Sequence, residues 1–518
     1  MPPSSCGATC AADRASPKNR PAGSGYGHRA FYLCKARIIG EVSLNSSPSA
    51  DRAGPILHFR GHGPEGLRLA AILIRPQDDP PPGALRLQAG DVAAARLAEI
   101  DGLVLWRYDF TLGPEDDGYE LEGRLHPVRT ALEGDLRIGF VSCNGEENGD
   151  LDRDAAERNL MWDRLVAQHE HEPLALLLQG GDQIYADEAT HGHPLSEDWP
   201  DRVPKNPTEA ELADLTRHLR HRFARRYLSV LTPAPCARLM AEVPTLSVWD
   251  DHDICDGWGS LKDSRTRSAV GQTLFRVARE TYLLFQHGAT EADIPELFLD
   301  PQGRSLGWCR QLPGLTLLAP DLRSERHRRR IMGDAGWQGV EAVDPPPGQT
   351  FLVSSVPLLG PRLSVIEAIM TAIPRMQHYE DDLRDQWQSR THRDEWRRML
   401  REVLRMRASG PVTAISGEIH LATRAIMDGD EGRVHQLVAS GISHRAPPRA
   451  YARCLGLLAG LGEAPLPGHP IRILPLPGQA HRYTAERNFL LLERRDGRWQ
   501  AIWHLEDSGR SPALDISD

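Results

Sequence analysis

The sequence lacks the cysteine spacing that marks a disulfide framework or a structural zinc module. Eight cysteines occur in 518 residues, and no CxxC pair repeats among them. Small disulfide-bonded domains and zinc modules both depend on such regular spacing. We therefore expect free thiols and a reducing compartment. The cysteines are Cys6, Cys10, Cys34, Cys143, Cys236, Cys255, Cys309 and Cys454.

Long apolar runs are missing too. No segment approaches the ~18 consecutive apolar residues that a transmembrane helix requires. The first residues, MPPSSCGATCAADRASPKNRPAGSG, contain neither the apolar core of a secretory signal nor a twin arginine. We therefore expect a cytoplasmic protein that is neither exported nor bound to a membrane.

An excess of basic residues is also absent. The chain has 61 Lys and Arg against 71 Asp and Glu, which gives a formal net charge of -10. Stable nucleic-acid binding takes most of its affinity from basic side chains on phosphates. We expect no stable nucleic-acid partner, although nucleic acid is not excluded as a substrate.

Composition divides the chain into three regions. Residues 1–34 are rich in Pro, Ser, Gly and Ala, so we expect a disordered tail. Residues 35–132 contain short apolar or alternating runs between Gly, Pro and Asp, which predict an N-terminal β-sandwich domain. These runs are KARIIGEVSL, PILHFRG, LRLAAILIR, LVLWRYDFTL and GYELEGRLHPV. Residues 133–510 form the predicted catalytic domain.

In the third region, short apolar strands alternate with amphipathic helices, which indicates a layered α/β domain. The expected strands are Leu136–Val141, Leu174–Leu178, Thr245–Trp249, Leu315–Ala319 and Val412–Ile415. Two helical faces are expected, one with Leu274, Val277, Ala278, Tyr282 and Phe285, the other with Trp396, Met399, Leu400, Val403 and Leu404. Residues 191–207 and 447–478 have no period and are either lids over a site or simple surface insertions.

Ligand-capable side chains follow four of these strands. The stretch LLLQGGDQIYADE ends an aliphatic run in two glycines that permit a sharp turn, and it presents Asp182 and Tyr185. Cys143 follows the first strand, and the third is followed by the four residues DDHD at 250–253. SGEIH places Glu418 and His420 after the strand at residues 412–415.

Each cluster alone has an ordinary explanation. A cysteine after a strand is commonly a core residue, and DDHD is commonly a surface turn or a helix N-cap. Acids at the end of an all-aliphatic strand are costly unless something pairs with them. Because all four clusters obey one rule of placement, we expect them to converge at the strand ends.

The residue types suit two different cations. A short, rigidly held carboxylate such as Asp182 can bridge two ions. A thiolate from Cys143 and a phenolate from Tyr185 require a strongly acidic ion, for which Fe³⁺ is better suited than Mg²⁺. The carboxylates of Asp182, Asp251 and Glu418 suit a harder ion such as Ca²⁺, Mn²⁺ or Mg²⁺.

These motifs resemble the PhoD-like alkaline phosphatase/phosphodiesterase family of the calcineurin-type metallophosphoesterase superfamily. That family has SC after the first strand, then GDxIY, DDH and SGDxH. This chain has SCN at 142–144, GDQIY at 181–185, DDHD at 250–253 and SGEIH at 416–420, in the same order. The resemblance covers roughly residues 36–510 and implies an α/β fold: an N-terminal β-sandwich followed by a layered αββα sandwich of metallophosphoesterase type.

The resemblance also implies a dinuclear metal centre. Fe³⁺ would be held by Cys143, Asp182, Tyr185 and His420, and Ca²⁺, or another divalent ion such as Mn²⁺ or Mg²⁺, by Asp182, Asp251 and Glu418. His252 would face the leaving group, with Asp250 or Asp253 orienting its ring. Arg323, in APDLRSER, could steady a phosphate oxygen, or it could form a surface salt bridge.

Two departures from the family pattern matter. Glu418 stands where the family usually has Asp, and the extra methylene moves the carboxylate by about one bond length. The export signal usual in secreted relatives is missing, so nucleotides, sugar phosphates or lipid-derived diesters become the expected substrates.

The expected function is that of a metal-dependent phosphatase or phosphodiesterase, in which a bridging hydroxide attacks the phosphorus of a small mono- or diester. One alternative is a catalytically degenerate metal-binding or scaffold protein on the same fold. A second is a thiol enzyme with Cys143 as nucleophile, for which the sequence offers no motif that places a base. The sequence leaves the oligomeric state open.

Overall fold

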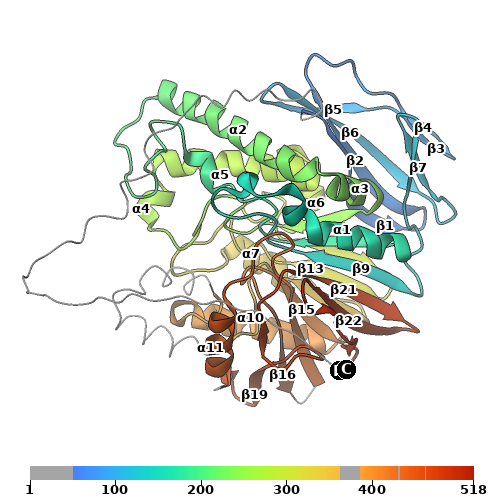
Figure 1. The fold of residues 1–518 in the computed structure, drawn as a ribbon, viewed down its shortest axis with the longest axis vertical. Coiled ribbons are helices and arrows are strands. Elements are labelled where there is room, and N and C mark those ends of the chain that lie inside the picture. Colours follow the sequence, from blue (N-terminus) through green and yellow to red (C-terminus); the bar gives the residue numbers. More distant parts are fainter. Residues whose placement is uncertain (1–50, 362–385, 430–431, 461) are drawn as a thin grey trace, which may run out of the picture. The chain divides into compact units, whose positions relative to one another are not determined.

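Two large β-sheets with parallel strands at their centres form the frame of the computed structural model (Figure 1). The structure describes residues 51–361, 386–429, 432–460 and 462–518. In this part of the chain the first sheet has 11 strands, in the order β23 (Gly509–Arg510), β22 (Arg498–Leu505), β21 (Asn488–Arg495), β9 (Leu136–Val141), β10 (Leu176–Gly180), β11 (Thr245–Val248), β1 (Ala53–Gly63), β2 (Gly66–Pro76), β6 (Leu103–Leu112) and β5 (Ala95–Ile100), with β24 (Leu514–Asp515) beside β22.

The second sheet has nine strands among the described residues. Their order is β12 (Trp308–Leu312), β13 (Leu315–Ala319), β14 (Gln349–Val353), β15 (Val412–Ser416), β17 (Gly432–Val438), β16 (Ala422–Gly429), β19 (His469–Leu474) and β18 (Glu463–Leu466), with β20 (Tyr483–Thr484) beside β16. Strands β13, β14, β15 and β17 run parallel, as do β9, β10 and β11 in the first sheet. Each sheet therefore presents several carboxyl ends at one edge.

The central strands are buried along their whole length and rich in aliphatic residues because both faces of each sheet are covered. Alternate residues of the second sheet enter two different cores. Leu317 and Phe351 belong to the core shared with the first sheet, whereas Leu318 and Leu352 belong to the core on the opposite face. This alternation follows from the two-residue period of a strand.

Helices cover the outer face of each sheet, so the layers run helix, sheet, sheet, helix (Figure 1). The core of the first sheet includes residues of α1 (Ala155–His171), α2 (Glu209–Leu231), α3 (Ala234–Glu242), α5 (Ala269–Thr281), the π-helical turn η3 (Tyr282–Gln286) and α6 (Ile294–Leu297). The outer core of the second sheet includes residues of α7 (Asp334–Glu341), α10 (Arg393–Arg407) and α11 (Arg449–Ala459). The short helices η1 (Asp150–Asp152), η2 (Asp187–Thr190), α4 (Asp263–Thr266), η4 (Glu291–Asp293) and η6 (Arg390–His392) lie in the connections.

The predicted elements of the α/β region are confirmed. All five expected strands are present as β9, β10, β11, β13 and β15, with ends shifted by up to two residues. Both helical faces are present in α5 with η3 and in α10, and Leu404 alone among their ten residues is only partly buried. The irregular segment expected over residues 447–478 is wrong, because it contains α11, β18 and β19. Frequent Pro and Gly concealed these short elements: Pro448 precedes α11, and Gly468 turns between β18 and β19 with φ 80°.

The N-terminal region is β-rich, as predicted. Part of it forms a separate sheet of four strands within the described residues, in the order β4 (Gly90–Val92), β3 (Leu85–Leu87), β7 (Gly118–Leu121) and β8 (Arg124–Pro127). Its long strands instead continue the first large sheet, because β1 pairs in parallel with β11 through His58 and Thr245. The boundary after residue 132 stays a prediction, and the tail 1–34 and the run KARIIGEVSL lie outside the described residues.

The described cysteines Cys143, Cys236, Cys255, Cys309 and Cys454 are free thiols, as predicted. Cys6, Cys10 and Cys34 lie outside the described residues. Across the ranges that the structure describes, no helix has both the length and the apolar character needed to cross a membrane.

Two glycines end β10, and steric contact requires both of them. A Cβ on Gly180 would lie 2.2 Å from the Phe140 ring. Gly181 has φ 103°, and a Cβ there would lie 2.8 Å from the Asp250 Cβ. The sharp turn expected after the aliphatic run is therefore present, and it brings the loops after β10 and β11 into contact.

We expect Gly181→Ala to lower the free energy of unfolding by about 1–3 kcal/mol, because the new side chain adds backbone strain and a clash with Asp250. Urea denaturation followed by circular dichroism measures the change. Gly63→Ala is the control, since a Cβ at Gly63 meets nothing within 4 Å. Equal unfolding midpoints for the two variants would contradict this account of the turn.

Candidate metal centre

The predicted ligands lie on strained backbone at strand ends. Cys143, Asp182, Glu418 and His420 have φ of 56°, 53°, 67° and 53°. This left-handed region is costly for residues with a Cβ, and such strain clusters at functional sites. The other described non-glycine residues with positive φ are Asp101, Glu122, Asn206 and Asp496.

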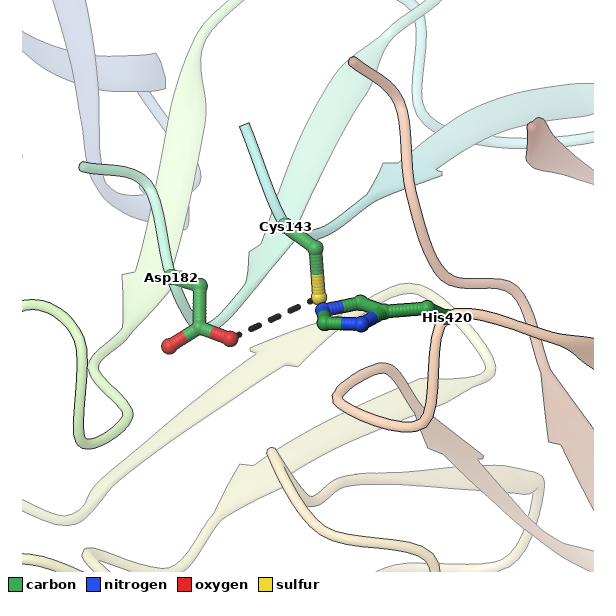
Figure 2. A group of neighbouring side chains, drawn as sticks. All are labelled: Cys143, Asp182 and His420. Atoms are coloured by element: carbon green, nitrogen blue, oxygen red, sulfur yellow. Dashed lines mark hydrogen bonds between the residues drawn. The ribbon is translucent and has the colours of Figure 1, made fainter. Parts of the chain in front are cut away.

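The structure brings the four residues of the first predicted cation site together. Ligand atoms of Cys143, Asp182 and His420 all lie within 4.8 Å of one another (Figure 2). The Cys143 Sγ is 3.5 Å from Asp182 Oδ2, and the Tyr185 hydroxyl is 2.9 Å from His420 Nε2. These atoms come from the loops after β9, β10 and β15, so residues distant in the sequence face one point.

Burial opposes every charged form in this cluster. It raises the pKa of the Cys143 thiol and the Tyr185 phenol well above their usual values, and the nearby Asp182 adds to both shifts. It also raises the pKa of Asp182 well above its usual value; His252 counters this shift, whereas Asp250 and Asp251 reinforce it. A cation would stabilise these three anions, so the donor set fits a metal ion.

His420 shows the same effect in the opposite direction, because burial and the neighbouring His444 lower its pKa well below the usual value. A neutral imidazole is the form that binds metal. Asp182 Oδ1 is buried and has no hydrogen-bond partner among the described residues. An orphaned carboxylate oxygen beside a neutral imidazole is what a bound cation would satisfy.

A second cluster lies on the other side of Asp182. Carboxylate oxygens of Asp182, Asp250 and Asp251 lie within 4.8 Å of one another. Asp250 accepts a hydrogen bond from the Ser355 hydroxyl at 2.7 Å and another from Arg323. Asp182 therefore belongs to both clusters, as expected of a carboxylate that bridges two ions.

Arg323 is completely buried beneath this second cluster. Its guanidinium donates to Asp250, to Asp251 at 3.2 Å, and to the carbonyl oxygen of Trp258 at 2.9 Å. The surface salt bridge considered from the sequence is therefore wrong. The charged run around Arg323 suggested exposure, but the strand end at β13 turns this side chain inward.

Glu418 joins none of the ligand clusters found in the described residues. Both of its carboxylate oxygens instead accept from the Gln386 amide, at 2.8 and 2.7 Å. Its role as a metal ligand stays a prediction, and the geometry favours Asp250 in its place.

His252 lies against the first cluster. Its ring stacks on Tyr185 with centroids 4.4 Å apart, and its Nδ1 is 3.0 Å from both oxygens of Asp187. The expectation that Asp250 or Asp253 orients this ring is wrong. Asp187 lies in η2, two residues beyond Tyr185, and is one of the acids in the stretch that ends β10.

Asp253 has a different task. Its carboxylate accepts the backbone N–H groups of Asp182, Gln183, Ile184 and Asp250 at 2.9 to 3.2 Å. The Gln286 amide donates to the same group at 2.8 Å. Asp253 thus fixes the loop that carries Asp182 to the loop that carries Asp250 and Asp251.

The sequence reasoning missed a fifth segment, which follows β17. The Ser440 hydroxyl is 3.2 Å from Cys143 Sγ and accepts the His420 backbone N–H at 2.8 Å. The His444 ring stacks on the His420 ring with centroids 3.4 Å apart. Ser440 follows β17 at the same spacing as Cys143 follows β9, which is the signal that could have identified it.

Comparison with known proteins supports the family resemblance. The sequence model of the family described as PhoD related phosphatase matches residues 145–380. An uncharacterized protein of Saccharomyces cerevisiae, YGR266W, is 25% identical over 400 residues, which is 62% of this chain and 56% of that protein. This chain thus spans little more than half the length of that curated relative.

Solved structures give a matching fold. The structure of PhoD superposes with a TM-score of 0.52 and 11% sequence identity, covering 91% of this chain and 93% of that one. A second solved structure is that of GAP50, the anchor in the inner membrane complex of Plasmodium. It has a TM-score of 0.38 and 8% sequence identity, and the match covers 74% of this chain and 89% of the GAP50 chain. This likeness is too weak to inform the fold. This chain is therefore similar to PhoD related phosphatases over residues 145–380, and its fold resembles that of PhoD.

Proposed function

We propose that the chain is a metal-dependent phosphoric ester hydrolase that acts on small phosphate mono- or diesters. The convergence of Cys143, Asp182, Tyr185 and His420 at one buried point is the observation that carries this proposal. A buried thiol, phenol and carboxylate are costly together without a cation. The match of residues 145–380 to the PhoD related phosphatase model supports the same chemistry.

The proposed centre holds two cations. Cys143, Asp182, Tyr185 and His420 would hold Fe³⁺, because thiolate and phenolate ligands require a strongly acidic ion. Asp182, Asp250 and Asp251 would hold Ca²⁺, Mn²⁺ or Mg²⁺, which prefer carboxylate oxygens. Such a pair, when bound, would activate water as a nucleophile at neutral pH and would neutralise charge on the phosphoryl oxygens.

His252 is the proposed general acid. Burial by itself lowers the pKa of this ring, but the carboxylates of Asp187, Asp251 and Asp182 raise it well above the usual value. The imidazolium therefore keeps a proton to donate. Because Asp187 accepts from Nδ1, Nε2 is the nitrogen left to protonate the departing alkoxide oxygen.

Arg323 is proposed as a positioning residue. Its guanidinium is completely buried and contacts Asp250 and Asp251, so its hydrogen bonds orient those carboxylates. This arrangement favours orientation of the second site over direct contact with a phosphate oxygen. The planar guanidinium suits this task, since it can donate to several oxygens in fixed directions.

The structure disfavours the thiol enzyme. Cys143 Sγ is hydrogen-bonded to the Asp182 carboxylate and the Ser440 hydroxyl. The His420 imidazole lies within 4.8 Å of it, but Nε2 of that ring is bonded to Tyr185 and burial lowers its pKa well below the usual value, which makes it a weak base for the thiol proton. Burial also raises the pKa of this thiol. The scaffold alternative keeps one supporting observation, which is the Glu418 carboxylate held by Gln386.

Elemental analysis of the purified protein with a chromogenic diester and monoester panel tests the proposal. We expect bound iron with a second divalent metal, a coloured tyrosinate-to-iron transition, and hydrolysis that chelators abolish. A scaffold would release no product at any metal loading. Inactivation by thiol alkylation together with indifference to chelators would instead favour the thiol enzyme.

Asp182→Asn should reduce hydrolysis to below about a tenth of the wild-type rate, because the amide cannot bridge two cations. Steady-state rates with a chromogenic diester, together with metal content per chain, measure the effect. Asp198→Asn is the matched control, since the Asp198 side chain is 66% exposed. Retention of more than about a tenth of the rate would count heavily against the bridging role.

Asp187→Asn should slow hydrolysis in a way that depends on the leaving group. General acid catalysis is typically worth about 10²- to 10⁴-fold, and only a basic leaving alkoxide needs the proton. We therefore expect a large loss in kcat for alkyl esters and a much smaller loss for p-nitrophenyl esters. His252→Gln should show the same pattern. Equal losses for both ester classes would show that the pair does not act on the leaving group.

A further inference from the structure

His444 presents the face of its ring to His420. The two ring centroids are 3.4 Å apart and the planes differ by 12°. The His444 ring also contacts the Tyr185 ring, with centroids 5.5 Å apart. His444 is therefore in contact with two of the proposed ligands of the first cation, although it was not among the residues expected from the sequence.

Both nitrogens of His444 are engaged elsewhere. Nδ1 donates to the carbonyl oxygen of Arg445 at 2.7 Å, and Nε2 lies 3.3 and 3.4 Å from the two oxygens of Glu147. His444 joins none of the ligand clusters in the described part of the chain. With its edge held in this way, the ring offers no ligand atom to a cation and can contact His420 only through its face.

The segment that carries His444 is bonded to the loop that carries Cys143. The His444 backbone N–H donates to the carbonyl oxygen of Cys143 at 3.1 Å. Arg153, whose side chain is 4% exposed, donates to the carbonyl oxygen of Ser443 at 2.8 Å and pairs with Glu146 at 3.4 Å. His444 and Glu147 are therefore fixed relative to each other by the backbone on both sides.

His420 itself lacks the usual support of a ligand imidazole. A metal-bound histidine normally donates its second ring nitrogen to a carboxylate, a carbonyl or water, which fixes the ring. Among the described residues, no hydrogen bond is made by His420 Nδ1; the ring is bonded only through Nε2, to Tyr185. Stacking against a fixed neighbouring ring is the support that the structure offers in its place.

We infer that His444, anchored by Glu147, is a positioning residue that holds the His420 ring in its ligating orientation. This inference rests on the proposed function, in which His420 binds the first cation. The pair acts through His420 and touches neither the substrate nor the reacting atoms. Its removal should therefore weaken retention of the first cation while the second cation is retained.

Metal retention, measured on the full chain by elemental analysis after dialysis against graded chelator, tests the inference without relying on turnover. His444→Ala should release iron at about 10- to 100-fold lower chelator concentration than the wild type, which is the usual effect of losing support around a ligand. His444→Phe keeps a flat ring at this position and should retain iron close to the wild-type level. Glu147→Gln, which weakens the anchor, should give an intermediate result, and the tyrosinate-to-iron absorbance should change in the same order.

His221→Ala is the matched control, because His221 forms a His–Asp pair with Asp101 on the surface, with 47% of its side chain exposed. Iron retention by His444→Ala equal to that of the control would overturn the inference, as would equal losses in His444→Phe and His444→Ala. If His444→Ala does not fold, as judged by circular dichroism, the variants His444→Phe and Glu147→Gln still test the inference. Iron retention by Glu147→Gln equal to that of His444→Phe and the wild type would then overturn it.

The same measurement separates the two proposals. A wild-type chain that binds no iron would overturn the proposed function and this inference together. A wild-type chain that binds iron and hydrolyses esters, with His444→Ala unchanged, would overturn this inference alone.

Discussion

The arrangement of the site depends on the Asp253 carboxylate. It accepts four backbone N–H groups from two loops and one side-chain amide. Because these five hydrogen bonds meet on one carboxylate, a single side chain can hold the two loops together and fix the strained backbone at Asp182. Asp182 is carried by the first loop, and Asp250 and Asp251 by the second. The position of Asp182 relative to Asp250 and Asp251 is therefore set by a residue that belongs to none of the ligand clusters in the described residues.

The concentration of buried acids explains why this site needs positive charge. Asp182, Asp250, Asp251 and Asp253 are all buried, and Arg323 is the cation that contacts two of them. Several carboxylates in a weakly polar interior repel one another and lose their hydration, and the Arg323 guanidinium with the His252 imidazolium balances only part of their negative charge. Cations at the two clusters would balance the rest. Strain, burial and charge at the strand ends are then parts of one arrangement.

The two sheets meet at this centre. Cys143, Asp182 and Asp250 follow strands of the first sheet, whereas Glu418 and Ser440 follow strands of the second. Hydrogen bonds cross between the loops of the two sheets: the Ser142 hydroxyl donates to Ala439, and the Ile442 N–H donates to Ser142. Residues separated by 297 positions along the chain, Ser142 and Ala439, are thus held in contact. Hydrogen bonds between the loops, and not only packing between the sheets, define the position of each proposed ligand.

The sequence by itself determined the central strands and the residues at their ends. Strands covered on both faces are rich in aliphatic residues, so β9, β10, β11, β13 and β15 appear as short, mostly apolar runs, and the charged residues after their ends are conspicuous. Tertiary structure alone decided which polar groups meet. The side chain of Arg323 turns inward, Asp187 and not Asp253 holds His252, and Glu418 turns to Gln386. The joining of β1 to β11 and the stacking of His444 on His420 were decided in the same way, because pairing between distant segments leaves no periodic trace in the local sequence.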